Sequence, residues 1–324
     1  MAKFETSASG GNVGVIDMIS QVSVSVLKNR SVLGRLVYRD IEQRFTAGVG
    51  ATVNVRKPTV FGAKNLAKDS AVDNSKLDEK LIPVVIDTHS YVSTLTNTWD
   101  TTLNIESIAQ QITAPQAEAV AVGDENSVES RIAAELNKAI AAKGNDLKDA
   151  EGKFLSKAIE HKEGDSLRDT LVKLDLHMTE KKVPLEGRNL VVSPKFRAEI
   201  LSDDLFVRAD SYGKASLIQD GADKLEENYM GSFLGFRVFV STMIEGMVAF
   251  TGEAFTLVLR VPRPMDGAQS GASVDHDSKY GVRVTRAAVP ERLSVQVSTD
   301  VLCGAAILDA DRCIGVQLTP KTTR

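Results

Sequence analysis

The sequence predicts an α+β protein, in which helical and extended segments are grouped along the chain. Three observations indicate this class. A long extended hairpin follows residue 50, a helical pattern covers residues 115–143, and several alternating strands occupy the C-terminal part. With 324 residues the chain can bury a sizeable core and form more than one domain.

Composition limits the classes of function. The chain is 43% hydrophobic and 25% charged, with a net charge of -4, which is ordinary for a soluble protein of cytosolic type and unlike a dedicated nucleic-acid binder. Its two cysteines, Cys303 and Cys313, predict inert core thiols rather than a disulfide framework or a zinc site. No apolar run is long enough for a signal peptide or a membrane span.

The N-terminal segment predicts a helix after a polar, glycine-rich start. Residues Ile16, Ile19, Val22 and Val26 follow helical spacing, although QVSVSV also alternates as a strand does. Six basic residues against four acids in the first 45 give this segment a mildly positive charge. A solvated helix face is the ordinary explanation of such a charge.

The next segment predicts a long β-hairpin. Val53 and Val55 alternate on one limb, and Val84 and Ile86 alternate on the limb that continues through LIPVVIDTHSYVSTLTNTWDTTL. The tip, KDSAVDNSKLDEK, contains few large apolar residues. Because an isolated two-stranded hairpin is only marginally stable in water, we expect this one to lie on another surface, such as a neighbouring copy.

A helix is predicted over residues 115–143. Pro115 suits the first turn, Gly144 suits the C-terminal end, and Gly123 is expected to bend or split the helix. One apolar stripe is formed by Val128, Ile132, Leu136 and Ile140. Glu135 and Lys138 form an i,i+3 pair of opposite charge.

The remainder predicts a helix that stops at Pro184, a buried strand in GRNLVVSP and a helix in KFRAEILSDD. Strands are predicted in GFRVFVS and MVAFTGEAFTLVLRVP, and a polar loop over residues 264–280. Two or three alternating strands then close the chain.

No enzyme signature is present. The sequence lacks a P-loop, a GxSxG elbow, an HExxH motif and a strand-linked GxGxxG. The histidines His89, His161, His177 and His276 lie far apart, and His177 fits a structural or surface position. The acids beside His276 could suggest a metal site, but adjacent residues of one loop rarely converge on an ion. We therefore predict no catalytic, cofactor-binding or metal-binding residues, and no cofactor.

Taken in order, several segments resemble the major capsid proteins of tailed phages with the Hong Kong 97 fold, in the coat-protein-like branch common in phages of actinobacteria. The segments are YRDIEQRF–GVGATVNVRKP, YVSTLTNTWDTTLNI, DTLVKLDLHMTEKKVPLEGRNLVVSPKFRAEIL, GSFLGFRVFVS and GAAILDADRCIGVQL. The resemblance covers essentially the whole chain by serial order and spacing, although no single motif is diagnostic.

The resemblance implies an order of domains. Residues 1–48 would be an N-terminal arm, 49–98 the extended loop, and 99–149 the peripheral domain with its spine helix at 115–143. Residues 150–282 would form the axial domain, and 283–324 the closing strands of the peripheral domain. With about 48 residues before the loop, we expect no fused scaffolding segment and no large inserted domain.

The function implied is a non-enzymatic subunit of the icosahedral head shell of a tailed double-stranded DNA phage. Its expected partners are further copies, in hexamers and pentamers, a portal protein, separate scaffolding and cement proteins, and packaged DNA contacted without sequence preference. No membrane partner is expected. It would assemble in the host cytoplasm and reside in the virion. Two alternatives are an encapsulin-like compartment shell, told apart by neighbouring cargo genes, and an α+β enzyme with an unrecognised site.

The family's founding member joins a loop lysine to an asparagine late in a neighbour's chain. Here Lys64, Lys68 and Lys76 lie near the loop tip, but no asparagine follows Asn228. The late acids Asp300 and Asp309 are poor electrophiles when ionised. The resemblance therefore predicts a shell without covalent cross-links.

Overall fold

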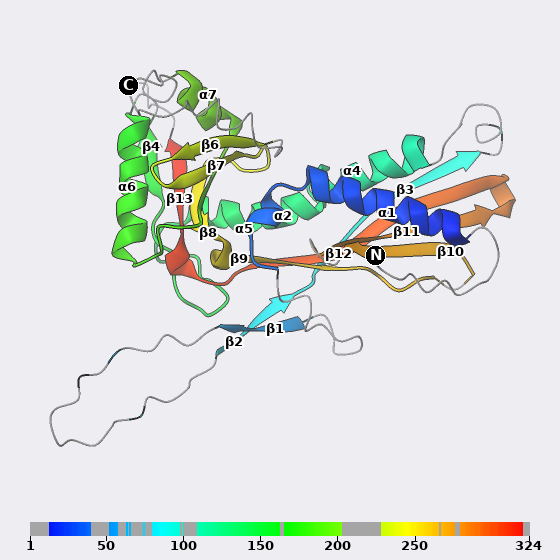
Figure 1. The fold of residues 1–324 in the computed structure, drawn as a ribbon, viewed down its shortest axis with the longest axis horizontal. Coiled ribbons are helices and arrows are strands. Elements are labelled where there is room, and N and C mark those ends of the chain that lie inside the picture. Colours follow the sequence, from blue (N-terminus) through cyan, green and yellow to red (C-terminus); the bar gives the residue numbers. More distant parts are fainter. Residues whose placement is uncertain are drawn as a thin grey trace.

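The computed structural model describes residues 13–39, 52–57, 63, 65, 74, 80–97, 99, 109–162, 165–202, 228–265, 267–275 and 279–319. His276 and nearly all of the hairpin tip lie outside these residues. Two sheets with their covering helices make up the body, and a two-stranded hairpin lies beside it (Figure 1). No described helix is long and apolar enough to cross a membrane.

The first sheet has five antiparallel strands in the order β10-β11-β12-β3, with β9 also paired to β12. The strands are β3 (Thr88–Asn97), β9 (Phe255–Arg260), β10 (Gln269–Asp275), β11 (Tyr280–Val289) and β12 (Ser294–Ile307). The long strand β12 is central, because its N-terminal part pairs with β11 and its C-terminal part with β9.

The second sheet has six strands in the order β4-β13-β8-β5-β7-β6, with parallel pairs β4–β13 and β5–β7. The strands are β4 (Ile159–Lys162), β5 (Arg188–Val192), β6 (Tyr229–Phe233), β7 (Phe236–Val240), β8 (Met247–Thr251) and β13 (Cys313–Thr319). The helices α6 (Leu167–Glu180) and α7 (Pro194–Ser202) pack on it. Strands β5 and β8 are buried at every position, as expected of central strands covered on both faces.

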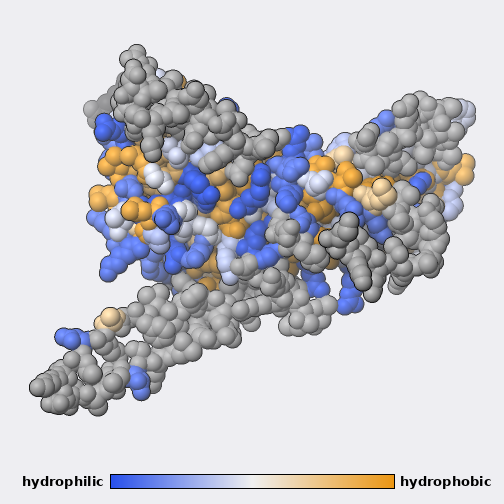
Figure 2. Space-filling model, in the orientation of Figure 1, coloured by the Kyte–Doolittle hydropathy of each residue, from blue (hydrophilic) through white to orange (hydrophobic). Residues whose placement is uncertain are grey.

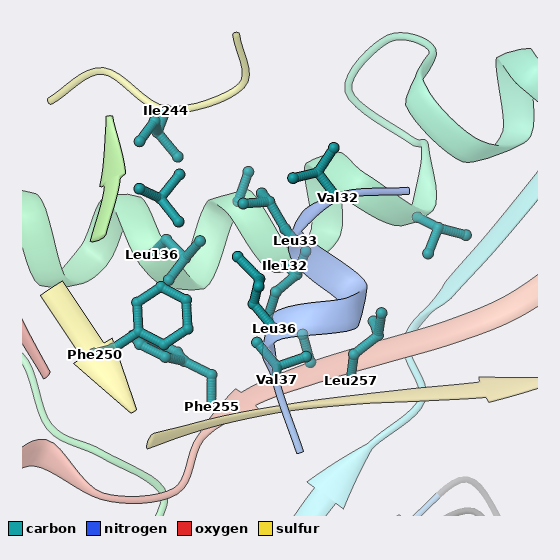
Figure 3. Close-up of a cluster of buried hydrophobic side chains, with 14 of the residues drawn as sticks. Val32, Leu33, Leu36, Val37, Ile132, Leu136, Ile244, Phe250, Phe255 and Leu257 are labelled. Atoms are coloured by element: carbon teal, nitrogen blue, oxygen red, sulfur yellow. The ribbon is translucent and has the colours of Figure 1, made fainter. Parts of the chain in front are cut away.

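Four further helices are α1 (Val13–Arg30), α2 (Leu33–Leu36), α4 (Ala114–Val122) and α5 (Val128–Ala141). Helices α1 and α4 cover one face of the five-stranded sheet, and α5 contacts strands of both sheets. In Figure 3, Leu33 and Leu36 of α2 lie between α5 and strand β9, against Ile132 and Leu257. The described chain also contains a π-helical turn (Ala109–Thr113) and short 3-10 turns at Gly252–Ala254, Pro290–Arg292 and Ala310–Arg312.

The helix predicted over residues 115–143 is two helices. The N–H of Gly123 bonds the carbonyl of Ala119 at 2.8 Å, and a side chain at Gly123 would lie 2.2 Å from that oxygen. Glycine at this position therefore permits a tight end to α4. Ser127 then starts α5, where its hydroxyl accepts the N–H of Ser130. The predicted apolar stripe of α5 is confirmed, because Val128, Ile132, Leu136 and Ile140 are all buried.

Helix α1 is confirmed as a helix, but its buried face differs from the predicted stripe. Val22 is exposed, whereas Ser20 and Ser23 are buried and bond backbone carbonyls three and four residues earlier. Small residues are needed here because the helix approaches the sheet closely: a side chain at Gly271 would lie 2.7 Å from Ile16. Hydrophobicity alone gives no signal for such a face.

The second limb of the predicted hairpin is divided between two sheets. Strands β1 (Thr52–Lys57) and β2 (Lys80–Val85) pair from Thr52↔Val85 to Lys57↔Lys80. The second limb then turns, and β3 joins the five-stranded sheet beside β12. The base of the hairpin lies against that sheet, because a side chain at Gly304 of β12 would lie 2.2 Å from the carbonyl of Val85.

Two further expectations require correction. The polar loop predicted over 264–280 contains strand β10, which pairs with β11 along its length. The two sheets also do not divide the chain at the boundary expected between residues 150–282 and 283–324. Strands β9 and β10 join the sheet of β3 and β12, while β13 joins the sheet of β4 to β8. The helices predicted within 166–184 and 195–204 are confirmed as α6 and α7, and the strands of GRNLVVSP and GFRVFVS are confirmed as β5 and β7.

Candidate assembly surface

The described residues hold no group of three or more His, Cys, Asp or Glu side chains placed to bind a metal ion. Cys303 and Cys313 are buried and unbonded to each other, as predicted. Burial raises the pKa of the Cys303 thiol to about 12 and raises that of Cys313 further. Thiols in this state are poor nucleophiles at neutral pH.

His161 illustrates how the buried polar groups are used. Its ring contacts the Thr170 hydroxyl at 2.9 Å and the Glu199 carboxylate at 3.1 Å, and it is fully buried beside Phe196. These contacts join strand β4 to helices α6 and α7. A hydroxyl, an imidazole and a carboxylate in series can perform nucleophilic chemistry, but here the hydroxyl and the ring are closed to solvent. His177, by contrast, lies half-buried on α6.

The structure exposes three surfaces that are suited to contact with other proteins. The first is the base of the β1–β2 hairpin, which is fixed to the body through Ile82 and Val84, packed with Val258 and Leu308. Val85, next along the strand, is exposed. The C-terminal part of β2, residues 82–85, therefore has one anchored side and one open side.

The second surface is the face of the five-stranded sheet opposite α1 and α4, in the part that lies beyond the hairpin base at Gly304. Thr94 of β3 accepts a hydrogen bond from Gln116 of α4, so the even-numbered side chains of β3 near it point toward the helices. Tyr91 and Leu95 point the other way and are exposed, at 67% and 44%. Large apolar side chains on an open sheet face are typical of a protein interaction surface.

Charged side chains fix the strands of this open face. Asp300 of β12 accepts two hydrogen bonds from the Arg283 guanidinium of β11, at 2.9 and 2.5 Å, and contacts His89 of β3 at 2.8 Å. The carboxylate is almost completely buried, whereas His89 is half exposed beside Tyr91. Three neighbouring strands are thus cross-linked by one ion-pair network. Sequence reasoning missed this network, because alternating strands show which residues share a face only after the strand order is known.

The third surface is the outer side of α6, at one end of the molecule. Val172 and Leu176 lie four residues apart on this helix and are both exposed. Figure 2 shows hydrophobic side chains at the surface of this end of the molecule. The buried face of α6 carries Leu167, Leu171 and Leu174, so the helix is apolar on two sides. A helix of this kind is typically covered on both sides.

The N-terminal helices are held to the body by a buried carboxylate. Glu129 of α5 accepts hydrogen bonds from the Ser31 hydroxyl at 2.6 Å and from the N–H groups of Leu33 and Gly34 at 3.1 and 3.3 Å. The Tyr280 hydroxyl in turn donates to Ser31 at 2.7 Å. Burial raises the pKa of Glu129, although the three hydrogen bonds oppose the change. Burial also raises the pKa of Tyr280 to about 12.

Two ion pairs hold α1 from its C-terminal half. Lys28 contacts Asp275 of β10 at 2.9 Å, and Arg30 contacts Glu118 of α4 at 3.2 Å. Part of the positive charge predicted for this segment therefore faces acids of the same chain. Helix α1 is docked on the body, and its basic residues Lys28 and Arg30 are engaged there.

No protein-family model matches the sequence, and no curated protein sequence matches it. The fold does match solved structures. The capsid structure of Cyanophage P-SCSP1u has a TM-score of 0.60 at 11% identity, covering 90% of this chain and 89% of that one. The mature capsid of bacteriophage PhiM1 has a TM-score of 0.56 at 16% identity, covering 98% and 92%.

A structure of Mycobacterium phage Che8 has a TM-score of 0.53 at 17% identity, covering 88% of this chain and 90% of that one. The similarity extends over nearly the full length of both partners in each comparison. The α+β capsid-protein fold expected from the sequence resemblance is therefore confirmed, at a sequence identity that shows the fold alone.

Proposed function

We propose that the chain is the major capsid protein of a tailed double-stranded DNA phage, and that many copies form its icosahedral head shell. The main support is the match to phage capsid subunits over about nine-tenths of the chain. Geometry agrees with this role, because the hairpin, the open sheet face and the outer side of α6 offer several separate contact surfaces. Its role is structural, without a catalytic step.

The proposed domains follow the observed sheets. Residues 1–48 are the N-terminal arm and 49–87 the extended loop. The five-stranded sheet with α4 and α5 is the peripheral domain, and the six-stranded sheet with α6 and α7 is the axial domain. This division replaces the boundary at residue 282, because the pairing of β9, β10 and β13 crosses it.

The proposed mechanism is geometric. Subunits associate in hexamers and pentamers through many weak contacts, and each contact buries a surface that is open in the single chain. Exposed apolar residues supply the main driving force, since burying apolar area contributes roughly 25 cal/mol per Å². The further proposed partners are a portal protein, separate scaffolding and cement proteins, and packaged DNA. Contact with DNA is weak and screened by salt, because the chain carries a net charge of -4.

Electron microscopy of the chain produced together with its phage partners tests the proposal. We expect closed shells with icosahedral symmetry. A chain that stays monomeric under every such condition would contradict the function. Shells that form without phage partners and enclose a protein cargo would instead support a compartment shell.

A further inference from the structure

A cleft of about 470 Å³ lies between the α2 segment and the six-stranded sheet. Its wall includes Arg35 of α2, Asn189 of β5, Arg237 of β7 and Thr251 at the end of β8. A smaller adjoining hollow is also lined by Arg35 and Arg237. Both arginines therefore line one recess in the surface, and both are exposed.

Both arginines are incompletely bonded. Arg35 donates to the backbone carbonyls of Ser31 at 2.7 Å and Asn29 at 3.4 Å, and Arg237 donates two hydrogen bonds to the side-chain oxygen of Asn189, at 3.0 and 2.7 Å. All of these acceptors are neutral. Each guanidinium has five N–H donors, so donors remain on both. Within the described part of the chain, neither arginine contacts a carboxylate.

A second observation independently indicates a ligand. Thr251 lines the same cleft and is only 7% exposed, and its hydroxyl oxygen is buried without a hydrogen-bond partner among the described residues. A buried hydroxyl without a partner costs about 1–3 kcal/mol, so such groups are usually satisfied in the working state. The supporting Asn189 is 1% exposed, and its amide also contacts the carbonyl of Leu36. The cleft is therefore built from fixed groups.

We propose that this cleft receives a carboxylate-bearing segment from a second copy of the chain. An Asp or Glu side chain of that copy pairs with Arg35 and Arg237, in the part of the cleft that Thr251 also lines. Paired donors on planar guanidinium groups match the two oxygens of a carboxylate. This inference rests on the proposed function, which places a second copy against every subunit.

The charges at the rim favour a carboxylate segment over a nucleic acid. Glu186 and Glu253 also line the cleft, and Glu253 is paired with Arg312. Successive phosphates of a nucleic-acid backbone would lie against these carboxylates, whereas a single acidic side chain need not. The chain itself carries 43 acidic against 39 basic residues, so a second copy offers many carboxylates.

Carbodiimide coupling of assembled shells tests this inference. The variants Arg237→Lys and Arg35→Lys keep the positive charge and add an amine that a carbodiimide joins to a carboxylate in direct contact. Arg237→Gln removes both the charge and the amine and is the matched control. We expect the lysine variants alone to give a new detergent-stable dimer, above the background that the other lysines of the chain give in every variant. Peptide mass spectrometry should join the introduced amine to an Asp or Glu of a second copy, with or without nuclease treatment.

The outcomes separate this inference from the proposed function. Wild-type chains that form no shell would overturn both. Shells that form normally but give no new dimer band, or coupling only to Glu186 or Glu253 of the same chain, would overturn the inference alone. Protection of the introduced amine by DNA, lost on nuclease treatment, would show a nucleic-acid contact and would also overturn it. As a second measure, Arg35→Glu combined with Arg237→Glu should reduce shell yield at least tenfold while the free subunit keeps its melting temperature.

Discussion

The Glu129 carboxylate accepts the hydroxyl hydrogen of Ser31 at 2.6 Å, although 98 residues separate the two in sequence. The same carboxylate accepts the N–H groups that begin α2, so it acts as the cap of a helix to which it does not belong. We expect Glu129→Ala to lower the free energy of unfolding by about 2 kcal/mol or more, because buried donors lose their acceptor. Chemical denaturation of unassembled subunits measures this. Glu118→Ala, at an exposed ion pair, is the control, and equal effects would contradict the capping role.

The same residue gives a pH dependence of defined sign. Burial raises the pKa of Glu129 above its ordinary value of 4.5, so the folded chain binds this proton more tightly than the unfolded chain does. The free energy of unfolding therefore falls as the pH rises from 4.5 to the folded pKa, and is level above it. Glu129→Gln cannot ionise, so the stability of the wild type relative to this variant should increase as the pH is lowered toward 4.5.

Asp311 provides the opposite sign as a control. Its burial raises its pKa, but hydrogen bonds from the Lys153 and Lys181 ammonium groups more than offset this and lower the pKa below 3.8. The ionised Asp311 therefore adds to the free energy of unfolding above pH 3.8, and this stabilisation is lost as the pH falls through the folded pKa. Asp311→Asn should therefore be less stable than the wild type at neutral pH, and the difference in free energy of unfolding should shrink as the pH is lowered. Parallel pH profiles of the wild type and Glu129→Gln would contradict the assignment.

The helices and strands were predictable where local pattern determines them. The stripe from Val128 to Ile140 predicts a buried helix face, and the structure buries all of it. Two long-range effects were not visible in the sequence. Ser20 and Ser23 are buried because α1 lies very close to β10, and strand β10 forms from polar residues because β11 supplies its hydrogen bonds. Glu129 could not be singled out, because its partners lie about a hundred residues away.

Leu136 tests the packing of α5. Its side chain is fully buried in the cluster that joins α2, α5 and β9. We expect Leu136→Ala to cost about 2–5 kcal/mol and Leu136→Asp to abolish soluble folding, because the carboxylate would be buried without a partner. Lys138→Ala, two residues away on the exposed side, should cost about 0.5 kcal/mol or less. Unchanged melting of Leu136→Asp would mean that this face of α5 is open to solvent.

Asp300 tests the network across the open sheet face. Its side chain is 5% exposed and that of Arg283 is 11% exposed. Removing one partner of a buried pair leaves the other charge uncompensated, so we expect Asp300→Ala to cost about 3–5 kcal/mol. Glu160→Ala removes the exposed pair with Lys157 and should cost about 1 kcal/mol or less. Denaturation midpoints of the two variants measure these losses of stability. Similar losses in Asp300→Ala and Glu160→Ala would rule out a special role for the network.

The last prediction concerns how assembled shells are held. Lys64, Lys68 and Lys76 of the extended loop lie outside the described residues, and no asparagine follows Asn228 as an acceptor. The late acids are engaged elsewhere. Asp300 forms the pair with Arg283, and Asp309 contacts Arg312 at 3.3 Å while its carboxylate accepts the N–H of Asp311.

A carboxylate held in an ion pair is a poor electrophile for an amine, so the structure adds a physical reason to the missing asparagine. We therefore expect a non-covalent shell, stabilised where the open faces of the hairpin and sheet are buried against neighbouring copies. Mature particles boiled in detergent and reductant should release a single band near 34.9 kDa. A ladder of dimers to hexamers that survives this treatment would show covalent joining. Mass spectrometry of the ladder would then identify the acceptor, with Asp300→Asn and Asp309→Asn particles as the direct comparison.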